Sequence, residues 1–173
     1  MLRRLTRDRR GSAAVEFVFI APVMLLFYYG LVEVSQALLA NRRASHVATV
    51  VGDIVGQNPQ TTTTEVNDIF EIAGAIFRPL PTTSLSIRIT SIRIETDGTQ
   101  TVVWSQAKGS MAPLSGTTTE VPPSMIDPGF GVIRAETSYA FSSPLQELLP
   151  EPINLSHTVY MKPRARVAVL RPD

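Results

Sequence analysis

The sequence contains no cysteine and only two histidines, His46 and His157, among its 173 residues. Without cysteine there are no disulfide frameworks, thiol nucleophiles, iron–sulfur clusters or cysteine zinc sites. Two histidines are too few for a histidine-rich metal site. We therefore expect no metal and no cofactor, and cysteine usage gives no indication of the redox compartment.

Catalytic motifs are lacking as well. The sequence has no glycine-rich phosphate loop, no HExxH and no G-x-S-x-G. Glu147 and Glu151 lie near Pro150 in a segment with the composition of a solvated loop, and His157 has no acidic neighbour in the sequence. The prediction is that this protein is not an enzyme.

Charge is nearly balanced overall but unevenly distributed. The 16 basic and 15 acidic residues leave a net charge of +1, which argues against a protein that coats nucleic acid. Residues 1–11 hold five arginines and one aspartate, a net charge of +4, whereas residues 44–173 hold nine basic and twelve acidic residues.

A long apolar segment follows the basic N-terminus. Phe17 to Val32 contains no charge, and extending the segment to 13–39 adds only Glu16 and Glu33. About 20 apolar residues span a bilayer core. Because arginines gather on the N-terminal flank, we expect one span with that flank in the cytoplasm and the C-terminal part outside.

A cleaved secretory signal peptide is one alternative. Its apolar region is usually about 7–15 residues long and is followed by a small-x-small cleavage site. Here the apolar segment is longer, and Ala37-Leu38-Leu39 offers no such site. This favours a segment that remains in the protein.

The junction between the arginines and the apolar segment has a specific order of residues. Gly11 is followed by four residues beginning with Ser12, and then by Glu16 and Phe17. Glycine can present an extended backbone to a protease. Ser12 is a good N-cap for a helix that starts directly after it, and Glu16 would then lie in the first turns, where the helix dipole favours negative charge.

This order resembles the processing site of type IV prepilins, and most of all the TadE/TadF minor pseudopilins of the tight-adherence (Tad, or Flp) pilus. The similarity extends to Ala21-Pro22-Val23, Glu33, the Val103-Trp104-Ser105 strand and Lys162-Pro163-Arg164. One departure is Phe17, where major Flp pilins often have tyrosine. The mature chain would also be far longer than a major Flp pilin, which favours a minor subunit.

The resemblance implies cleavage after Gly11 by a membrane prepilin peptidase, which leaves Ser12 as the new N-terminus. It implies that Glu16 pairs with a free N-terminal amine during assembly. The implied partners are the inner membrane, the peptidase, other Tad pilins and pseudopilins, and platform proteins. The protein would act in pilus assembly or initiation, with its C-terminal domain in the periplasm, and either enter the pilus or stay in the membrane.

An uncleaved signal anchor is the competing hypothesis. In that case Glu16 only caps its own helix dipole at the headgroup boundary, and Gly11 is a helix breaker. The protein would then be a signal-anchored periplasmic protein with a binding, sensor or envelope structural role.

The expected fold is α+β and pilin-like. Pro22 predicts a kink in the membrane helix, because proline removes a helix hydrogen bond. The helix is expected to continue, since apolar residues recur at helical spacing up to Val55. This divides the chain into a leader (1–11), a transmembrane and extended amphipathic helix (12–58) and an extracytoplasmic domain (59–173).

The third segment is expected to hold one helix and a small antiparallel sheet. Thr62 and Glu65 have the spacing of a capping box, and apolar residues from Val66 to Phe77 share one helix face. From Ser84 the period changes to two, with a bulge expected at Thr90-Ser91 and a hairpin turn at Asp97-Gly98. About four strands are expected in all. They include 132–141 and a last strand from His157 to Leu170 on which Arg164 and Arg166 form the polar face. The long connection 108–131 is typical of a functional or mobile loop.

Overall fold

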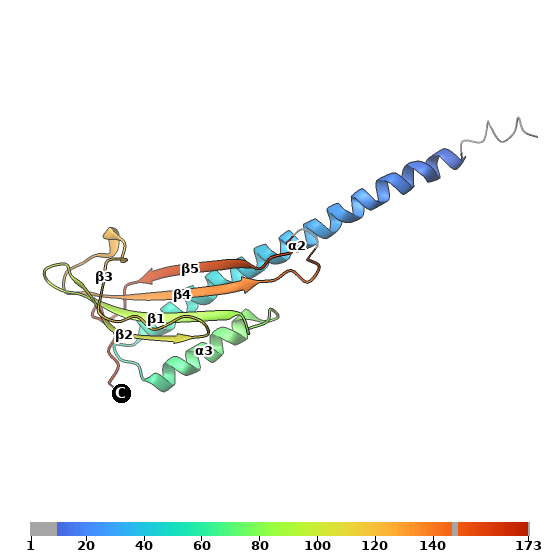
Figure 1. The fold of residues 1–173 in the computed structure, drawn as a ribbon. Coiled ribbons are helices and arrows are strands. Elements are labelled where there is room, and N and C mark those ends of the chain that lie inside the picture. Colours follow the sequence, from blue (N-terminus) through green and yellow to red (C-terminus); the bar gives the residue numbers. More distant parts are fainter. Residues whose placement is uncertain (1–9, 147–148, 173) are drawn as a thin grey trace, which may run out of the picture.

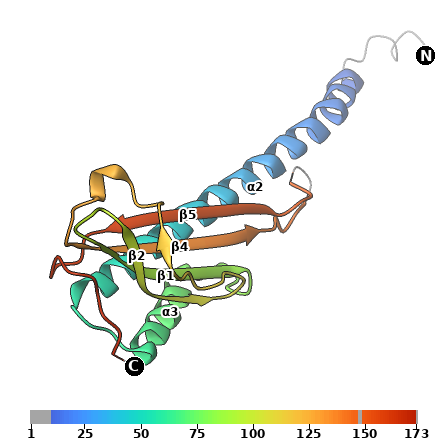
Figure 2. The same ribbon diagram turned by 60° about the vertical axis from the view of Figure 1, so that its left-hand side comes forward.

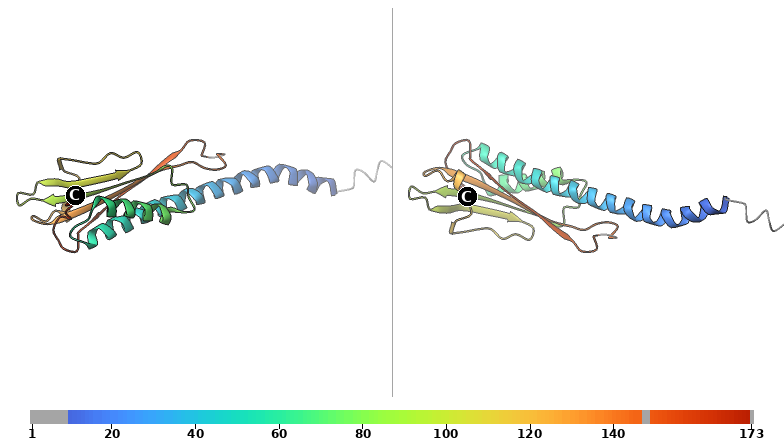
Figure 3. Two further views of the ribbon diagram at one scale, coloured as in Figure 1. Left: turned by 90° about the horizontal axis from the view of Figure 1, so that it is seen from below. Right: turned by 90° about the horizontal axis from the view of Figure 1, so that it is seen from above.

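The computed structural model describes residues 10–146 and 149–172 of the chain. One curled antiparallel sheet packs against two helices that lie on the same face (Figures 1 and 3). The elements follow one another as α2 (Arg10–Gln57), α3 (Thr63–Phe77), β1 (Leu85–Ile94), β2 (Gln100–Lys108), β3 (Thr117–Thr118), the 3-10 turn η1 (Pro123–Met125), β4 (Gly131–Phe141) and β5 (Ile153–Met161). The predicted α+β fold with a pilin-like layout is confirmed.

Helix α2 is much longer than the sheet that it supports. Its N-terminal part projects beyond the domain, whereas its C-terminal part runs beneath β4 and β5 (Figures 1 and 2). The buried side chains recur at helical spacing, as the sequence predicted, and are Ala40, Ala44, Val47, Ala48, Val51 and Val55. Most of these residues belong to the same core as α3 and the sheet, so this part of α2 and the outer domain form one packed unit.

Helix α3 begins with the predicted capping box. The Thr62 hydroxyl accepts a hydrogen bond from the backbone N–H of Glu65, and the Glu65 carboxylate accepts one from the backbone N–H of Thr62. These bonds satisfy donors that the first turn of a helix leaves free. The apolar face of α3 then packs against α2 and the sheet through Val66, Ile69, Phe70, Ala73 and Phe77.

The sheet has the order β3-β2-β1-β4-β5, with antiparallel pairing throughout. The expected bulge lies between Ser91 and Ile92, where the register with β2 shifts. The expected turn contains Gly98, whose positive φ of 86° suits glycine. Within the described residues the sheet has five strands rather than about four, because the short β3 adds to the edge of β2.

The prediction for the last strand was wrong at its C-terminal end. β5 ends at Met161, and Pro163 begins a turn in which the N–H of Arg166 donates to the carbonyl of Pro163 at 2.9 Å. Proline has no N–H to contribute to a sheet ladder, which explains the early end. Arg164 and Arg166 therefore lie in a turn and not on the polar face of a strand.

The chain after this turn folds back under the sheet. The carbonyl of Val169 accepts hydrogen bonds from Trp104 Nε1 and Ser91 Oγ, both at 2.8 Å. Leu170 exchanges backbone hydrogen bonds with the connection between the helices, because its N–H donates to Pro59 and its carbonyl accepts from Thr61. These bonds attach the C-terminal segment to the end of the domain that lies away from the projecting part of α2.

The connection between β2 and β4 covers part of the outer face of the sheet. Val121 is buried beside Ile92, Ile94 and Val132, and Met125 and Ile126 pack against this small cluster. The expectation of a functional or mobile loop did not include this packing role.

Candidate functional site on the N-terminal helix

The projecting part of α2 exposes large apolar side chains around its whole circumference. The exposed residues up to Leu31 are Val15, Phe17, Val18, Phe19, Ile20, Val23, Met24, Leu25, Leu26, Phe27, Tyr28, Tyr29 and Leu31. Soluble domains rarely expose an apolar surface of this extent. Among the described residues this is the one helix long and apolar enough to cross a membrane. The protein is therefore a single-pass, membrane-anchored protein.

The predicted processing and assembly residues lie at the start of this helix. α2 begins at Arg10, so the backbone of Gly11 and Ser12 is helical and Ser12 is not the N-cap. Ala13 and Ala14 are strong helix formers, which favours extension of the helix in this direction. Residues 1–9 of the expected leader lie outside the described residues.

Glu16 and Phe17 are both exposed on the first turns that follow Gly11. Glu16 lies four residues, or about one helical turn, after Ser12. Its carboxylate directly precedes the uncharged segment that starts at Phe17. The geometry therefore presents a carboxylate on the outside of the helix, where another chain can approach it.

Pro22 lies inside α2, and the helix continues through it without interruption. Its ring is on the exposed part of the helix. The kink expected at Pro22 stays a prediction.

Glu33 is the second carboxylate of the apolar segment, and its environment differs completely from that of Glu16. Its side chain is 0% exposed, and its Oε2 accepts a hydrogen bond at 3.0 Å from the backbone N–H of Leu149, in the connection between β4 and β5. Sequence reasoning noted Glu33 as a charge in the span but missed this contact. The available signal was general: carboxylates in apolar helices usually have a specific partner.

Arg43 joins the two helices at the membrane-proximal end of the domain. Its Nη1 donates to the carbonyl oxygen of Ile76 at 3.1 Å and also to that of Arg78. A cation is favourable here because the last carbonyls of a helix carry partial negative charge. His46, on a neighbouring turn of α2, is exposed, as expected of a surface side chain.

Ionisable groups on the sheet form structural pairs. Arg88 makes a two-pronged ion pair with Glu136, at 2.6 and 2.8 Å, and Arg134 contacts both Glu136 and Glu120. The hydrogen bond to Glu136 raises the pKa of Arg88. On the helix-facing side, His157 Nε2 and Asn41 Oδ1 are 2.9 Å apart. Within residues 10–146 and 149–172, no three His, Asp or Glu side chains are grouped in a way that could hold a metal ion.

The comparison with known proteins finds a match in the same segment that holds the predicted site residues. Residues 11–52 match the family model described as TadE-like protein. The match begins at the glycine of the expected cleavage site and covers Glu16, Phe17, Pro22 and Glu33. No match was found among curated proteins or among solved structures. The resemblance inferred from the leader and helix is confirmed: residues 11–52 of the chain are similar to the TadE-like family.

Proposed function

We propose that this TadE-like chain is a minor pilin or pseudopilin that is processed after Gly11 by a prepilin peptidase and acts in assembly or initiation of the Tad pilus. Its role is structural rather than catalytic. The single observation that carries the proposal is the exposed Glu16 at the start of a bare apolar helix that projects beyond the domain (Figure 1).

The physical argument concerns the charge on Glu16. An ionised carboxylate near the bilayer core is costly unless it is paired, by about 2.5–3.5 kcal/mol at the centre of an inserted helix. Cleavage after Gly11 would create a cationic amine on Ser12, one turn away on the same chain or on a neighbour. A pairing between chains would orient the subunits and let their apolar helices lie side by side.

The proposed orientation follows from the arginine-rich flank. The +4 charge of residues 1–11 favours a cytoplasmic N-terminus, an inner-membrane anchor and a periplasmic C-terminal domain. A reporter active only in the periplasm, fused after Asp173, should therefore work. Activity of a cytoplasmic reporter at the same position would reverse the topology.

Two variants test processing and assembly separately. Gly11→Val should leave Met1 in place on protein recovered from membranes, whereas the wild type should begin at Ser12. Glu16→Ala should insert and lose its leader normally but fail to assemble pili or to bind partner pilins. Glu16→Gln should behave like Glu16→Ala, because the amide keeps the shape of the side chain but not its charge.

The control variant is Glu151→Ala, which removes an exposed carboxylate of the outer domain and should leave assembly unchanged. Intact Met1 on the wild type, in cells that contain the peptidase, would establish the alternative of an uncleaved signal-anchored protein. Wild-type assembly by either Glu16 variant would limit Glu16 to an interfacial helix-capping role.

A further inference from the structure

The turn that follows β5 forms one wall of a pocket at the end of the domain farthest from the projecting part of α2. The pocket has a volume of about 420 Å³. Its lining combines basic, acidic, aromatic and small residues: Asp127, Phe130, Gly131, Lys162, Pro163, Arg164 and Arg166. Neither the membrane helix nor the proposed assembly role explains this combination.

The backbone of the turn is held rigidly. Pro163 is buried, the N–H of Arg164 donates to the carbonyl of Gly56 at the end of α2, and the carbonyl of Arg166 accepts from the N–H of Gly131. A Cβ on Gly131 would collide with the backbone of Val167 and Ala168, so this approach requires glycine. The backbone that carries the basic side chains of the turn is therefore held in place by the rest of the domain.

Arg166 has an unfavourable backbone conformation in this turn. Its φ is 60°, in the left-handed region that side chains other than glycine, asparagine and aspartate seldom adopt. Such strain is concentrated at binding and catalytic sites. A glycine would suit the backbone better, but only a long side chain places a guanidinium over the pocket.

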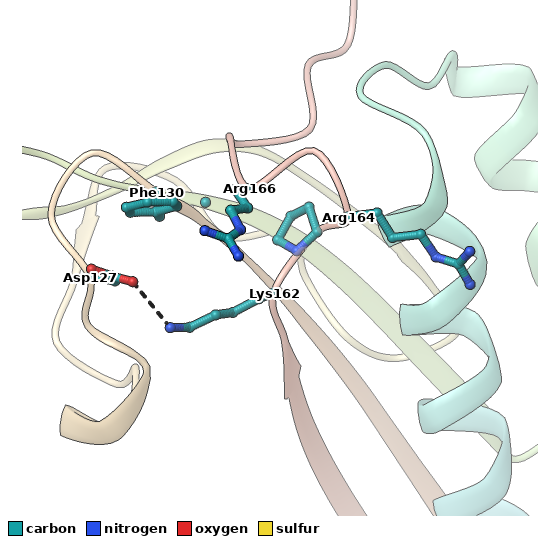
Figure 4. Close-up of a pocket in the computed structure, with 7 residues that line it drawn as sticks. Asp127, Phe130, Lys162, Arg164 and Arg166 are labelled. Atoms are coloured by element: carbon teal, nitrogen blue, oxygen red, sulfur yellow. Dashed lines mark hydrogen bonds and ion pairs between the residues drawn. The ribbon is translucent and has the colours of Figure 1, made fainter.

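Figure 4 shows how the charged groups lie. The Arg166 guanidinium and the Phe130 ring lie on the same side of the pocket as Lys162 and Asp127, whereas the Arg164 side chain extends toward α2. Lys162 Nζ and Asp127 Oδ2 are 3.3 Å apart, and both side chains are almost half exposed. An exposed pair of this kind is weak, so an incoming anion can compete for Lys162.

The hydrogen bonds made by the backbone N–H groups around the pocket indicate which kind of anion the pocket can bind. Phosphate sites in proteins commonly use a concave group of free backbone N–H groups. Here the N–H groups of Gly131, Arg164 and Arg166 all donate within the protein. Recognition must come from side chains, and Phe130 and Pro163 supply apolar walls that a small oxyanion would not need. Asp127 would repel a phosphate but could accept an N–H from a peptide.

We propose that this pocket binds an acidic peptide segment of a partner protein. A Glu or Asp carboxylate of the segment pairs with Arg166 and Lys162, and an adjacent apolar side chain packs on Phe130. Asp127 accepts a peptide N–H. The complementarity is local, because residues 44–173 as a whole are net negative.

The experiment uses the full chain in phospholipid nanodiscs and a dye-labelled tetrapeptide with three acidic residues and one phenylalanine. Fluorescence anisotropy should show saturable binding, and Arg166→Asn should weaken it by about tenfold, because it removes a charge-assisted hydrogen bond. Asparagine tolerates the left-handed backbone, so the unfolding temperature should not fall. Arg78→Ala, which removes an exposed arginine outside the pocket, should bind like the wild type.

Three outcomes would overturn the proposal. The first is absence of saturable binding to the wild type. The second is equal binding of the matched tetrapeptide in which amides replace the carboxylates. The third is displacement of the acidic peptide by inorganic phosphate at an equal or lower concentration, which would indicate a site for small oxyanions instead.

Discussion

The two parts of helix α2 have the same backbone but opposite relations to the rest of the molecule. Val23 is 64% exposed and Val47 is 0% exposed, although both are valines in the middle of one uninterrupted helix. The projecting part is apolar on every side, whereas the packed part has an apolar stripe with polar residues elsewhere. The first pattern suits a lipid environment and the second suits a helix that packs on a sheet.

The two carboxylates of the helix differ in the same way. Glu16 is exposed, whereas Glu33 is buried and its carboxylate accepts a hydrogen bond from the backbone N–H of Leu149 in the β4–β5 connection. They are 17 residues apart in sequence, or about 25 Å along a helix, which is close to the thickness of a bilayer core of about 30 Å. The two carboxylates near the ends of the apolar segment therefore have different surroundings: Glu16 is exposed, and Glu33 contacts the outer domain.

The largest expected effect comes from placing a charge on the packed face of α2. Val51→Asp should destabilise the domain by about 3–5 kcal/mol, because the carboxylate would be buried without a partner. The measurement is denaturant unfolding in detergent micelles, followed by the fluorescence of Trp104, which is buried and is the only tryptophan of the chain.

Thr49→Asp is the control, because Thr49 is exposed on the same part of the helix. It should change stability by less than about 0.5 kcal/mol. Equal destabilisation by the two variants would contradict the assignment of the packed face.

A smaller effect is expected from shortening one valine in each part of the helix. Val47→Ala should destabilise the domain by about 1–3 kcal/mol, because it removes buried apolar volume. Val23→Ala makes the same change on the exposed part. It should leave unchanged the midpoint of the unfolding transition that is followed by Trp104 fluorescence. If Val23→Ala were equally destabilising, the projecting part would contribute to the folded domain, and the contrast between the two parts would not hold.

Much of this architecture could be predicted from the sequence because it depends on local patterns. The stripe ending at Val55, the capping box of Thr62 and Glu65, and the turn at Gly98 each follow from a few neighbouring residues. Their physical causes act over one or two turns of chain. The family resemblance could likewise be stated from the residues between Gly11 and Phe17.

Features that depend on distant residues were missed. The hydrogen bond to Glu33 comes from the Leu149 amide, 116 positions later in the chain. The pocket beside Arg166 depends on the close approach of the turn after β5 to Gly131, which no periodicity indicates. Ser12 was expected as an N-cap, but helix propensity extends α2 back to Arg10. The proposed roles of the leader and of Glu16 remain predictions, because they concern a peptidase and other pilins.

The smallest effect is expected at Glu33, where the projecting and packed parts of α2 meet. Glu33→Gln keeps an acceptor oxygen for the Leu149 N–H but removes the negative charge. Hydrogen bonds to charged groups contribute about 1.5–3 kcal/mol and neutral ones about 0.5–1.5 kcal/mol, so a loss of about 1 kcal/mol is expected. We expect local opening of the β4–β5 connection rather than global unfolding, because this bond joins α2 to that connection.

Hydrogen exchange in micelles measures this opening directly. The Leu149 amide should exchange about fivefold faster in Glu33→Gln, and faster still in Glu33→Ala, which leaves the amide without this acceptor. The amide of Thr61 is the internal control, since it donates to Leu170 at the opposite end of the domain and should be unaffected. Unchanged exchange at Leu149 in both variants would mean that burial alone protects this amide. In that case Glu33 would not hold the connection against the helix, and its difference from Glu16 would lie only in exposure.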